Sequence, residues 1–194
     1  MPNRLTILVV EPDRQRAMLV VDGLKDVGEN EVHVISEVSA LSRKIAQHAP
    51  DVVIVDIGSP TRDMIEELSL ASAPLERPVA MFVDRSDDNL TKAAIEAGVS
   101  AYVVDDLRPE RLQPVMMAAI ARFNLFRRIR DELAETKRAL EERKVIDRAK
   151  GLLMKARGMS EDEAYAALRK AAMDQGKKIA DVAQALVTAA DLLS

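Results

Sequence analysis

Acidic side chains follow several of the apolar, β-branched segments in the first half of the sequence, and they are the residues best suited to chemistry there. They are Glu11, Asp13, Asp56, Asp84, Asp105 and Asp106. Carboxylate oxygens are the ligands that Mg²⁺ prefers, and an aspartate can accept a phosphoryl group. If folding brings these segment ends together, the cluster could hold Mg²⁺, with Glu11, Asp13 and Asp56 as the ligands if any metal binds, and one of its carboxylates could accept a phosphoryl group.

A second set of residues with chemical potential is basic and lies between Val145 and Met173. It comprises Arg148, Lys150, Lys155, Arg157, Arg169 and Lys170, with Tyr165 among them. Such a cluster is typical of a surface that binds a polyanion, but it equally suits the solvated face of a helical bundle. The cluster by itself leaves both interpretations open.

Charge is distributed unevenly along the 194 residues. Residues 1–121 carry 12 Lys and Arg against 20 Asp and Glu, a net charge of −8, whereas residues 122–194 carry 16 against 12, a net charge of +4. This asymmetry predicts two units with separate tasks, with any nucleic-acid contact in the rear unit. With three Phe, two Tyr and no Trp, a broad base-stacking platform is not expected.

Cysteine is absent from the sequence, which excludes disulfides, thiolate metal sites and thiol catalysis. The apolar run at residues 5–10 is too short for a signal peptide, and no apolar stretch reaches the roughly 18 residues that would span a bilayer. We therefore expect a cytoplasmic protein that does not contact a membrane.

Strands and helices are expected to alternate through the first half of the chain. The expected strands are residues 5–10, 32–35, 51–57, 78–83 and 101–104. The expected helices are residues 40–48, 64–71 and 88–97, preceded by one that ends near Gly28 and buries Ala17, Met18, Val21 and Leu24. Five strands joined in this way predict an α/β, doubly wound, five-stranded parallel sheet with its site at the carboxyl ends of the strands.

The region from residue 109 to 150 has few helix breakers after Pro114, and it predicts a long helix. Apolar residues recur every seven positions, as in a coiled-coil seam: Ala119, Phe126, Leu133 and Leu140, with Ile129 and Thr136 between them. Arg122 and Arg143 interrupt the pattern, and the seam could also dock on the protein's own sheet. We favour a dimerising helix over a solvated connector, because its other face is densely charged.

Three short helices are predicted at the carboxyl end of the chain. Gly158 can end the first in the left-handed conformation, and Ser160 with Glu163 forms a capping box that begins the second. The second helix should bury Ala164, Ala167, Leu168 and Ala171 and stop at Gly176, and the third should span residues 179–193. Close, alanine-rich packing leaves a small, flat surface, which argues against catalysis.

The order of elements over residues 4–122, and the segment DVVIVDI ending near Asp56, resemble the receiver domain of two-component response regulators. The resemblance implies a flavodoxin-like sheet. In that family, two acidic residues after the first strand bind metal, an aspartate on the third strand is phosphorylated, and a hydroxyl residue and a lysine contact the phosphate. Glu11 and Asp56 match the family's acidic and phosphorylated positions.

Three of the five working positions depart from the family. Pro12 stands at the second acidic position, with Asp13 one residue late, Val83 stands at the hydroxyl position and Asp105 at the lysine. Asp105 would repel an aspartyl phosphate. We therefore expect a pseudo-receiver that serves as an interaction surface and has no cofactor, with Mg²⁺ bound only if the receiver functions.

The tail resembles the ANTAR domain of RNA-binding transcription antiterminators. The motifs are AKGLLM at 149–154, RGMSEDEAY at 157–165, ALR at 167–169, AM at 172–173 and DVA at 181–183, within a match over about 135–193. The resemblance implies that the RNA-binding residues are Ala149, Lys150, Met154, Arg157, Gly158, Tyr165 and Arg169. Met154 and Tyr165 could instead be core residues, and Gly158 only a helix cap.

The combined resemblance divides the chain into a receiver-like domain (1–122), a linking helix (123–140) and an all-α three-helix ANTAR domain (141–194). It implies a leader RNA with two stem-loops as the target, bound by a homodimer so that the terminator hairpin cannot form. In the nitrate/nitrite-responsive branch of the family, it further implies control of nitrate assimilation and a nitrate or nitrite sensor protein that holds the antiterminator until its ligand arrives.

Two other functions compete with this one. In the first, Asp56 is phosphorylated by a histidine kinase and the output is still RNA binding. In the second, the chain is a protein-interaction adaptor that binds no nucleic acid. DNA binding is disfavoured because no helix shows a clear recognition pattern, and an enzyme is not expected because His33 and His48 lack metal-ligand spacing.

Overall fold

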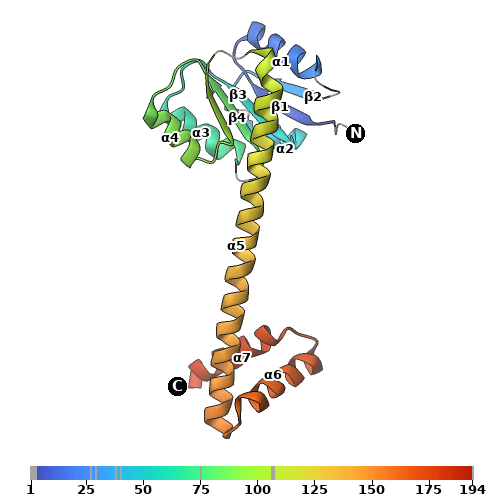
Figure 1. Ribbon diagram of the computed structural model, residues 1–194, viewed down its shortest axis with the longest axis vertical. Helices are drawn as coiled ribbons and strands as arrows, with labels where there is room; N and C mark the ends of the chain where they lie inside the picture. Colours follow the sequence, from blue (N-terminus) through green and yellow to red (C-terminus); the bar gives the residue numbers. More distant parts are fainter. Residues whose placement is uncertain are drawn as a thin grey trace. The chain divides into compact units, whose positions relative to one another are not determined.

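The computed structural model describes residues 4–26, 28, 30–37, 39, 41–74, 76–105 and 108–193. The chain forms two compact units, Met1–Arg128 and Ile129–Ser194 (Figure 1). No helix within the described ranges is long and apolar enough to cross a membrane.

The first unit is built on a five-stranded parallel sheet. Its strands are β1 (Thr6–Val10), β2 (Glu31–Ile35), β3 (Val52–Asp56), β4 (Val79–Val83) and β5 (Ala101–Val104), in the order β2-β1-β3-β4-β5. In the register, Val10 lies opposite Val55, and Asp56 lies opposite Phe82. The predicted doubly wound parallel sheet is thus confirmed, and every strand end falls within one residue of the expected one.

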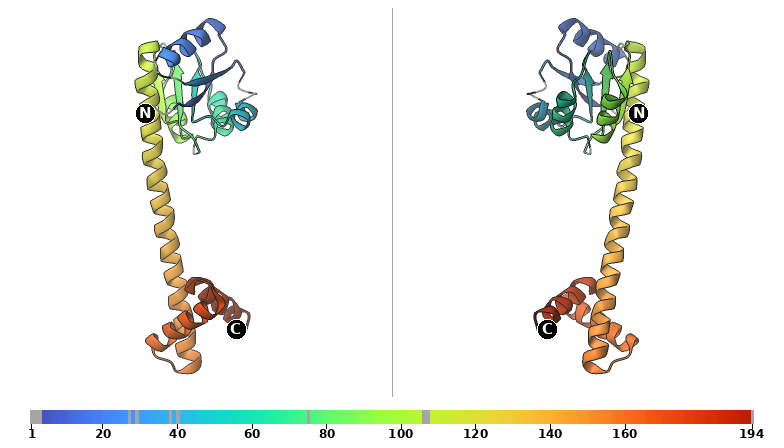
Figure 2. Two further views of the ribbon diagram at one scale, coloured as in Figure 1. Left: turned by 90° about the vertical axis from the view of Figure 1, so that its right-hand side faces the viewer. Right: turned by 90° about the vertical axis from the view of Figure 1, so that its left-hand side faces the viewer.

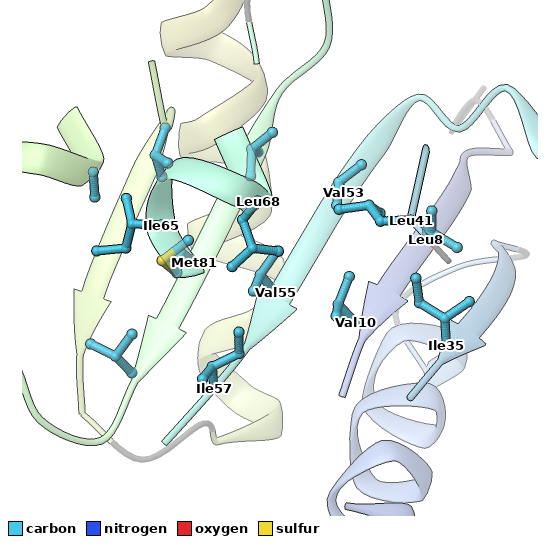
Figure 3. Close-up of a cluster of buried hydrophobic side chains, with 14 of the residues drawn as sticks. Leu8, Val10, Ile35, Leu41, Val53, Val55, Ile57, Ile65, Leu68 and Met81 are labelled. Carbon is cyan, nitrogen blue, oxygen red and sulfur yellow. The ribbon is translucent and has the colours of Figure 1, made fainter. Parts of the chain in front are cut away.

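Helices cover both faces of this sheet (Figure 2). Leu8 and Val10 of β1 belong to a core that includes α2 (Leu41–His48), α3 (Arg62–Ser72) and α4 (Asp88–Glu96) (Figure 3). Ile7 and Val9 belong to a second core, with α1 (Arg14–Asp26) and the start of α5 (Pro109–Arg157). Because successive strand side chains point to opposite faces, these apolar runs fill two cores. Ala40, the expected first residue of α2, lies outside the described residues.

The buried face of α1 differs from the expected one. Met18 is 61% exposed, and Val20 is fully buried in its place, with Ala17 and Leu24. The reason lies at Gly23, where an added Cβ would lie 3.0 Å from Pro109 Cβ. Because α1 packs against α5 as well as the sheet, its buried arc is rotated away from Met18.

Helix α5 is a single helix that includes both the predicted long helix and the first predicted tail helix. Its early residues Leu112, Met116, Ala119 and Phe123 are buried in the first unit. The next positions of the predicted seam, which we call the exposed seam, are about half exposed: Phe126, Ile129, Leu133 and Leu140. The start of the predicted seam thus docks on the protein's own sheet, and the remainder does not.

The second unit contains the end of α5, α6 (Glu161–Gln175) and α7 (Ile179–Leu193). Its local signals were predicted correctly: Gly158 has a φ of 65°, and Ser160 with Glu163 forms a complete capping box. The core contains Ala149, Leu168, Ala183 and Val187. The expected burial of α6 needs one correction, because Ala172 is buried whereas Ala167 and Ala171 are only partly so.

Candidate functional site

The acidic residues of the first unit meet at the carboxyl edge of the sheet, because β1, β3 and β4 are parallel and their ends share that edge. Glu11 is 4% exposed and Asp56 is 1% exposed. The backbone N–H of Glu11 donates to the Ile35 carbonyl oxygen at 3.0 Å, which fixes the loop that follows β1. Two carboxyl groups are therefore buried side by side, where a compensating cation is needed.

That cation is Arg16, which reaches the acidic edge from α1. Its Nε donates to Asp56 Oδ2 at 3.2 Å and its Nη2 to Asp56 Oδ1 at 2.8 Å. The same guanidinium donates to both carboxylate oxygens of Asp84, at 3.1 and 3.2 Å. We call this arrangement of Arg16, Asp56 and Asp84 the Arg16 bridge. Asp84 and Asp56 together hold the pKa of Arg16 above its ordinary value.

Local backbone geometry places both ends of the Arg16 bridge. Asp13 Oδ1 accepts hydrogen bonds from the backbone N–H groups of Gln15 (2.7 Å) and Arg16 (2.9 Å), so Asp13 caps α1. The backbone N–H of Asp84 donates to the Gly58 carbonyl oxygen at 2.9 Å. A Cβ on Gly58 would lie 2.9 Å from Asp84 Oδ2, so a larger residue there would displace the Asp84 carboxylate that Arg16 contacts.

The acidic edge does not fit a bound Mg²⁺. Arg16 Nη2 lies 2.8 Å from Asp56, and Arg16 Nε lies 3.4 Å from Glu11 Oε2, so a divalent ion among these oxygens would meet a fixed positive charge. Asp13 is used as a helix cap. Among the residues whose placement is described, no group of three or more His, Cys, Asp or Glu side chains is arranged to hold a metal.

Val83 and Asp105 stand where the receiver pattern has a hydroxyl residue and a lysine, and the structure shows the surroundings of both. Val83 is fully buried and offers no hydroxyl. The Asp105 carboxylate accepts a hydrogen bond from Arg111 of α5. Asp106, which was expected beside it, lies outside the described residues.

The Glu11 carboxyl is unusual among these groups. Burial, together with the neighbouring Asp56, raises its pKa from 4.5 to about 8. Its Oε1 accepts from the backbone N–H of Asp13 at 2.7 Å, whereas the buried Oε2 has no hydrogen-bond partner among the described residues. At neutral pH Glu11 therefore holds a proton, and Arg16 faces two carboxylates, those of Asp56 and Asp84.

This protonation predicts a pH dependence of stability that depends on Glu11. Between about pH 4.5 and pH 8 the folded chain binds a proton at Glu11 that the unfolded chain releases, so the free energy of unfolding falls as the pH rises. We expect Glu11→Gln to flatten this slope and to be more stable than the wild type at pH 8, on the order of 2 kcal/mol. Urea unfolding at pH 5 to 8 measures this, with the exposed Glu67→Gln as control. Parallel slopes in Glu11→Gln and wild type would contradict it.

In the second unit, the predicted RNA-binding residues divide between core and surface. Ala149 is fully buried, and its side chain packs in the core of the second unit. Met154 is 39% and Tyr165 is 44% exposed, so neither is a fully buried core residue. Arg157, Gly158 and Arg169 are also exposed, and Gly158 serves as the helix cap.

The Lys150 ammonium group forms ion pairs with two carboxylates of the second unit. Its Nζ lies 2.6 Å from Asp147 Oδ1 and 2.7 Å from Glu161 Oε1, and its side chain is only 14% exposed. The hydrogen bonds to Asp147 and Glu161 raise the pKa of Lys150. Lys150 thus links α5 to the first turn of α6, a contact that sequence reasoning missed because Glu161 lies across the Gly158 turn.

The Lys150–Glu161 contact also shows how the surface is assembled. On α5, Met154 lies one helical turn after Lys150, and Arg157 follows on the same side. On α6, Glu161, Tyr165 and Arg169 follow one another at intervals of four, so they form one row. Lys150 joins the two rows at Glu161, and the residues that follow this contact in each row are exposed. We call Met154, Arg157, Tyr165 and Arg169 the basic face.

The cations of the basic face are available to a ligand. Neither Arg157 nor Arg169 forms an ion pair with any residue that the structure describes. By contrast, Arg148 is paired with Asp191 at 2.6 Å. Exposed guanidinium groups can neutralise phosphates, and an exposed tyrosine ring can stack on a base.

Comparison with known proteins gives matches to both units. The ANTAR domain pattern matches residues 134–187. Transcriptional regulatory protein PdtaR of Mycobacterium tuberculosis (strain ATCC 25618 / H37Rv) is 30% identical over 179 residues, which are 91% of this chain and 87% of that protein. The nitrate regulatory protein of Klebsiella oxytoca is 51% identical over 57 residues, which are 29% of this chain and 14% of that protein.

Solved structures match the fold of the first unit. A CheY-like response regulator receiver domain from Methanospirillum hungatei JF-1 has a TM-score of 0.53 and 17% identity, covering 63% of this chain and 98% of that one. The BeF3-activated receiver domain of Klebsiella pneumoniae RstA has a TM-score of 0.51 and 22% identity, covering 59% of this chain and 97% of that one. At these identities the likeness concerns the fold.

Proposed function

Because the chain belongs to the family of ANTAR-domain regulators with an amino-terminal receiver-like domain, we propose that it is an RNA-binding transcription antiterminator. The basic face is the observation that carries this proposal. The target is a leader RNA with two stem-loops, and its binding keeps the terminator hairpin from forming. The relative matched over nearly the whole chain is a transcriptional regulator by name, which supports a regulatory rather than an enzymatic role.

The chemistry of the basic face suits hairpin loops. Bases in a loop are unstacked, so an aromatic ring can stack on them while arginines hold the phosphates. Tyr165 supplies the ring, and Arg157 and Arg169 supply the cations, with Met154 as an apolar neighbour. Lys150 is proposed to position these residues by linking α5 and α6, and it contacts RNA only if phosphate displaces Glu161.

The test measures binding of the full chain to its own RNA target. RNA that crosslinks to the protein in its host is first identified by sequencing. Three forms of it are then transcribed for the binding assay: one with both stem-loops, one with a single stem-loop, and one with altered loop bases. We expect tight binding to the two-stem-loop form that weakens as salt rises, because phosphate contacts release counterions. Absence of binding, or equal binding to RNA with altered loops, would favour the protein-interaction adaptor.

We further propose control by nitrate or nitrite through a sensor protein. The support is the similarity of the tail to the nitrate regulatory protein, which covers 29% of this chain. The acidic first unit, with a net charge of −8 over residues 1–121, is the proposed docking surface for the sensor. Co-purification from the host with and without nitrate tests this: a partner released by nitrate supports it, and unchanged association contradicts it.

The first unit is proposed to act as a pseudo-receiver without Mg²⁺. The Arg16 bridge supports this, because Arg16 donates to both oxygens of Asp56 and blocks the approach of a phosphoryl donor. We expect that acetyl phosphate and MgCl₂ leave the mass of the intact chain unchanged in mass spectrometry. A phosphoryl-sized increase that Asp56→Asn abolishes would instead establish the alternative of a kinase-activated response regulator.

The chain is also proposed to act as a homodimer on RNA, joined through the exposed seam. Leu133 and Leu140 are each 52% exposed on one side of α5, and a second copy of the helix would cover them. We expect Leu133→Glu to weaken dimerisation about 100-fold or more, since it would bury an unpaired carboxylate. Light scattering over a concentration series measures this. Ala134→Glu adds the same charge one residue away and should leave the dimer intact; an equal effect of both would contradict the seam.

A further inference from the structure

A cavity of about 350 Å³ lies at the amino-terminal edge of the sheet, opposite the Arg16 bridge. Leu5, Pro50 and Pro78, which precede β1, β3 and β4, line one side of it, and Ile120 and Phe123 of α5 line another. Its volume is at the lower end of the range for small-molecule sites, roughly 300 to 1,000 Å³. All of these residues belong to the first unit.

One buried polar atom in the wall of this cavity lacks a partner. Arg77 Nε is shielded from solvent and forms no hydrogen bond with the residues that the structure describes. The Arg77 side chain is 18% exposed, and its Nη2 lies 3.5 Å from Glu76 Oε2, at the limit of a hydrogen bond to a carboxylate that is 73% exposed. A buried, unsatisfied N–H is costly and rare in folded proteins, so this donor indicates a missing acceptor.

A second cation lines the same cavity. The Arg127 guanidinium lies 5.7 Å from the centre of the Phe123 ring, which holds it against the wall. Within the described chain Arg127 forms no ion pair. The carboxylate of Asp51, which also lines the cavity, already accepts from the backbone N–H of Thr6 at 2.9 Å. The lining thus holds two arginines and two carboxylates, Asp51 and the 73% exposed Glu76, and the one buried donor without a partner is Arg77 Nε.

We propose that the cavity binds a small organic anion. Its oxyanion group, a phosphate or a carboxylate, accepts hydrogen bonds from Arg77 and Arg127, and its apolar body packs on Ile120, Phe123 and Pro78. Two planar guanidinium groups suit such a planar or tetrahedral oxyanion, and the ring and proline surfaces suit a compact apolar group. This site is separate from both the Arg16 bridge and the basic face, and it goes beyond the proposed RNA function.

The test uses the full chain and two probes, phenyl phosphate and benzoate, with inorganic phosphate and benzyl alcohol as head-only and body-only controls. We expect phenyl phosphate or benzoate to bind about tenfold or more tightly than either control in calorimetry. The probe that binds more tightly shows whether the site prefers a phosphate or a carboxylate group. In NMR, the amide shifts of Asp51, Arg77 and Asn124 should change on binding.

Variants separate this site from other arginine-rich surfaces. Arg77→Gln and Arg127→Gln should each weaken binding about tenfold or more, whereas Arg62→Gln, an exposed arginine on α3, and Arg169→Ala, on the basic face, should not. Arg127 is exposed, so its variant keeps the test valid if Arg77→Gln fails to fold. Absence of binding by both probes, or binding that survives the loss of Arg77 and Arg127, would overturn the proposal.

Discussion

Replacing Arg16 with alanine is expected to lower the free energy of unfolding of the first unit by about 3 kcal/mol at neutral pH. The variant leaves Asp56, whose side chain is fully buried, without the cation that now touches both of its oxygens. Removing one partner of a buried ion pair typically costs about 3 to 5 kcal/mol. The lower end applies here, because the side chains of Arg16 and Asp84 are 33% and 34% exposed to solvent.

We expect the same variant, but not the wild type, to be stabilised by Mg²⁺. Without the guanidinium, the oxygens of Glu11, Asp56 and Asp84 remain at one sheet edge, and hard oxygen ligands suit Mg²⁺. We expect MgCl₂ to raise the melting temperature of Arg16→Ala and to leave that of the wild type unchanged. Lowering the pH should also restore stability to the variant, because protonation removes the uncompensated charges.

The control for this experiment is Arg14→Ala, which removes an exposed arginine two residues earlier on the same helix. It should lower stability by less than about 0.5 kcal/mol. If Arg16→Ala behaves like Arg14→Ala, or if Mg²⁺ stabilises the wild type equally, the Arg16 bridge does not replace a metal.

The double variant Tyr165→Ala, Arg169→Ala is expected to weaken binding to the two-stem-loop RNA about 100-fold. Stacking of an aromatic side chain on a base is worth about 1 to 3 kcal/mol, and each arginine on a phosphate also contributes to the salt dependence. The slope of log affinity against log salt should therefore fall by about 1. Circular dichroism should be unchanged, since both side chains are exposed on α6.

Two control variants test whether the loss of RNA affinity is specific to Tyr165 and Arg169. Arg62→Ala removes a 77% exposed arginine from the first unit and should leave RNA affinity unchanged. Lys150→Ala should loosen the link between α5 and α6, so that its effect on RNA appears together with a lower melting temperature. RNA affinity that is insensitive to Tyr165 and Arg169 would remove the basic face from the proposed function.

Features set by neighbouring residues were predictable from the sequence. The Gly158 turn and the capping box of Ser160 and Glu163 depend on residues within one helical turn, and both are present in the structure. The five strands were predictable because each is a short apolar run bounded by turn residues. Helical spacing likewise predicted the burial of Ala164 and Leu168.

Features that depend on distant segments were not predictable in the same way. Arg16 and Asp56 are 40 positions apart, and their contact depends on how α1 lies over the sheet edge. The sequence showed departures from the receiver pattern at Pro12, Val83 and Asp105, but it did not show that Arg16 contacts Asp56. The only available signal was an arginine one turn after the capping residue Asp13, where its side chain could reach back over the loop.

The covalent attachment of the Arg16 cation has a consequence for how the first unit can be controlled. A free ion binds and leaves according to its concentration, whereas a tethered guanidinium has a high effective concentration at Asp56 under all ionic conditions. Under the proposed function, the state of this edge is therefore insulated from changes in free magnesium and from stray phosphoryl donors. Signal fidelity then depends on which macromolecule occupies the surface of the unit.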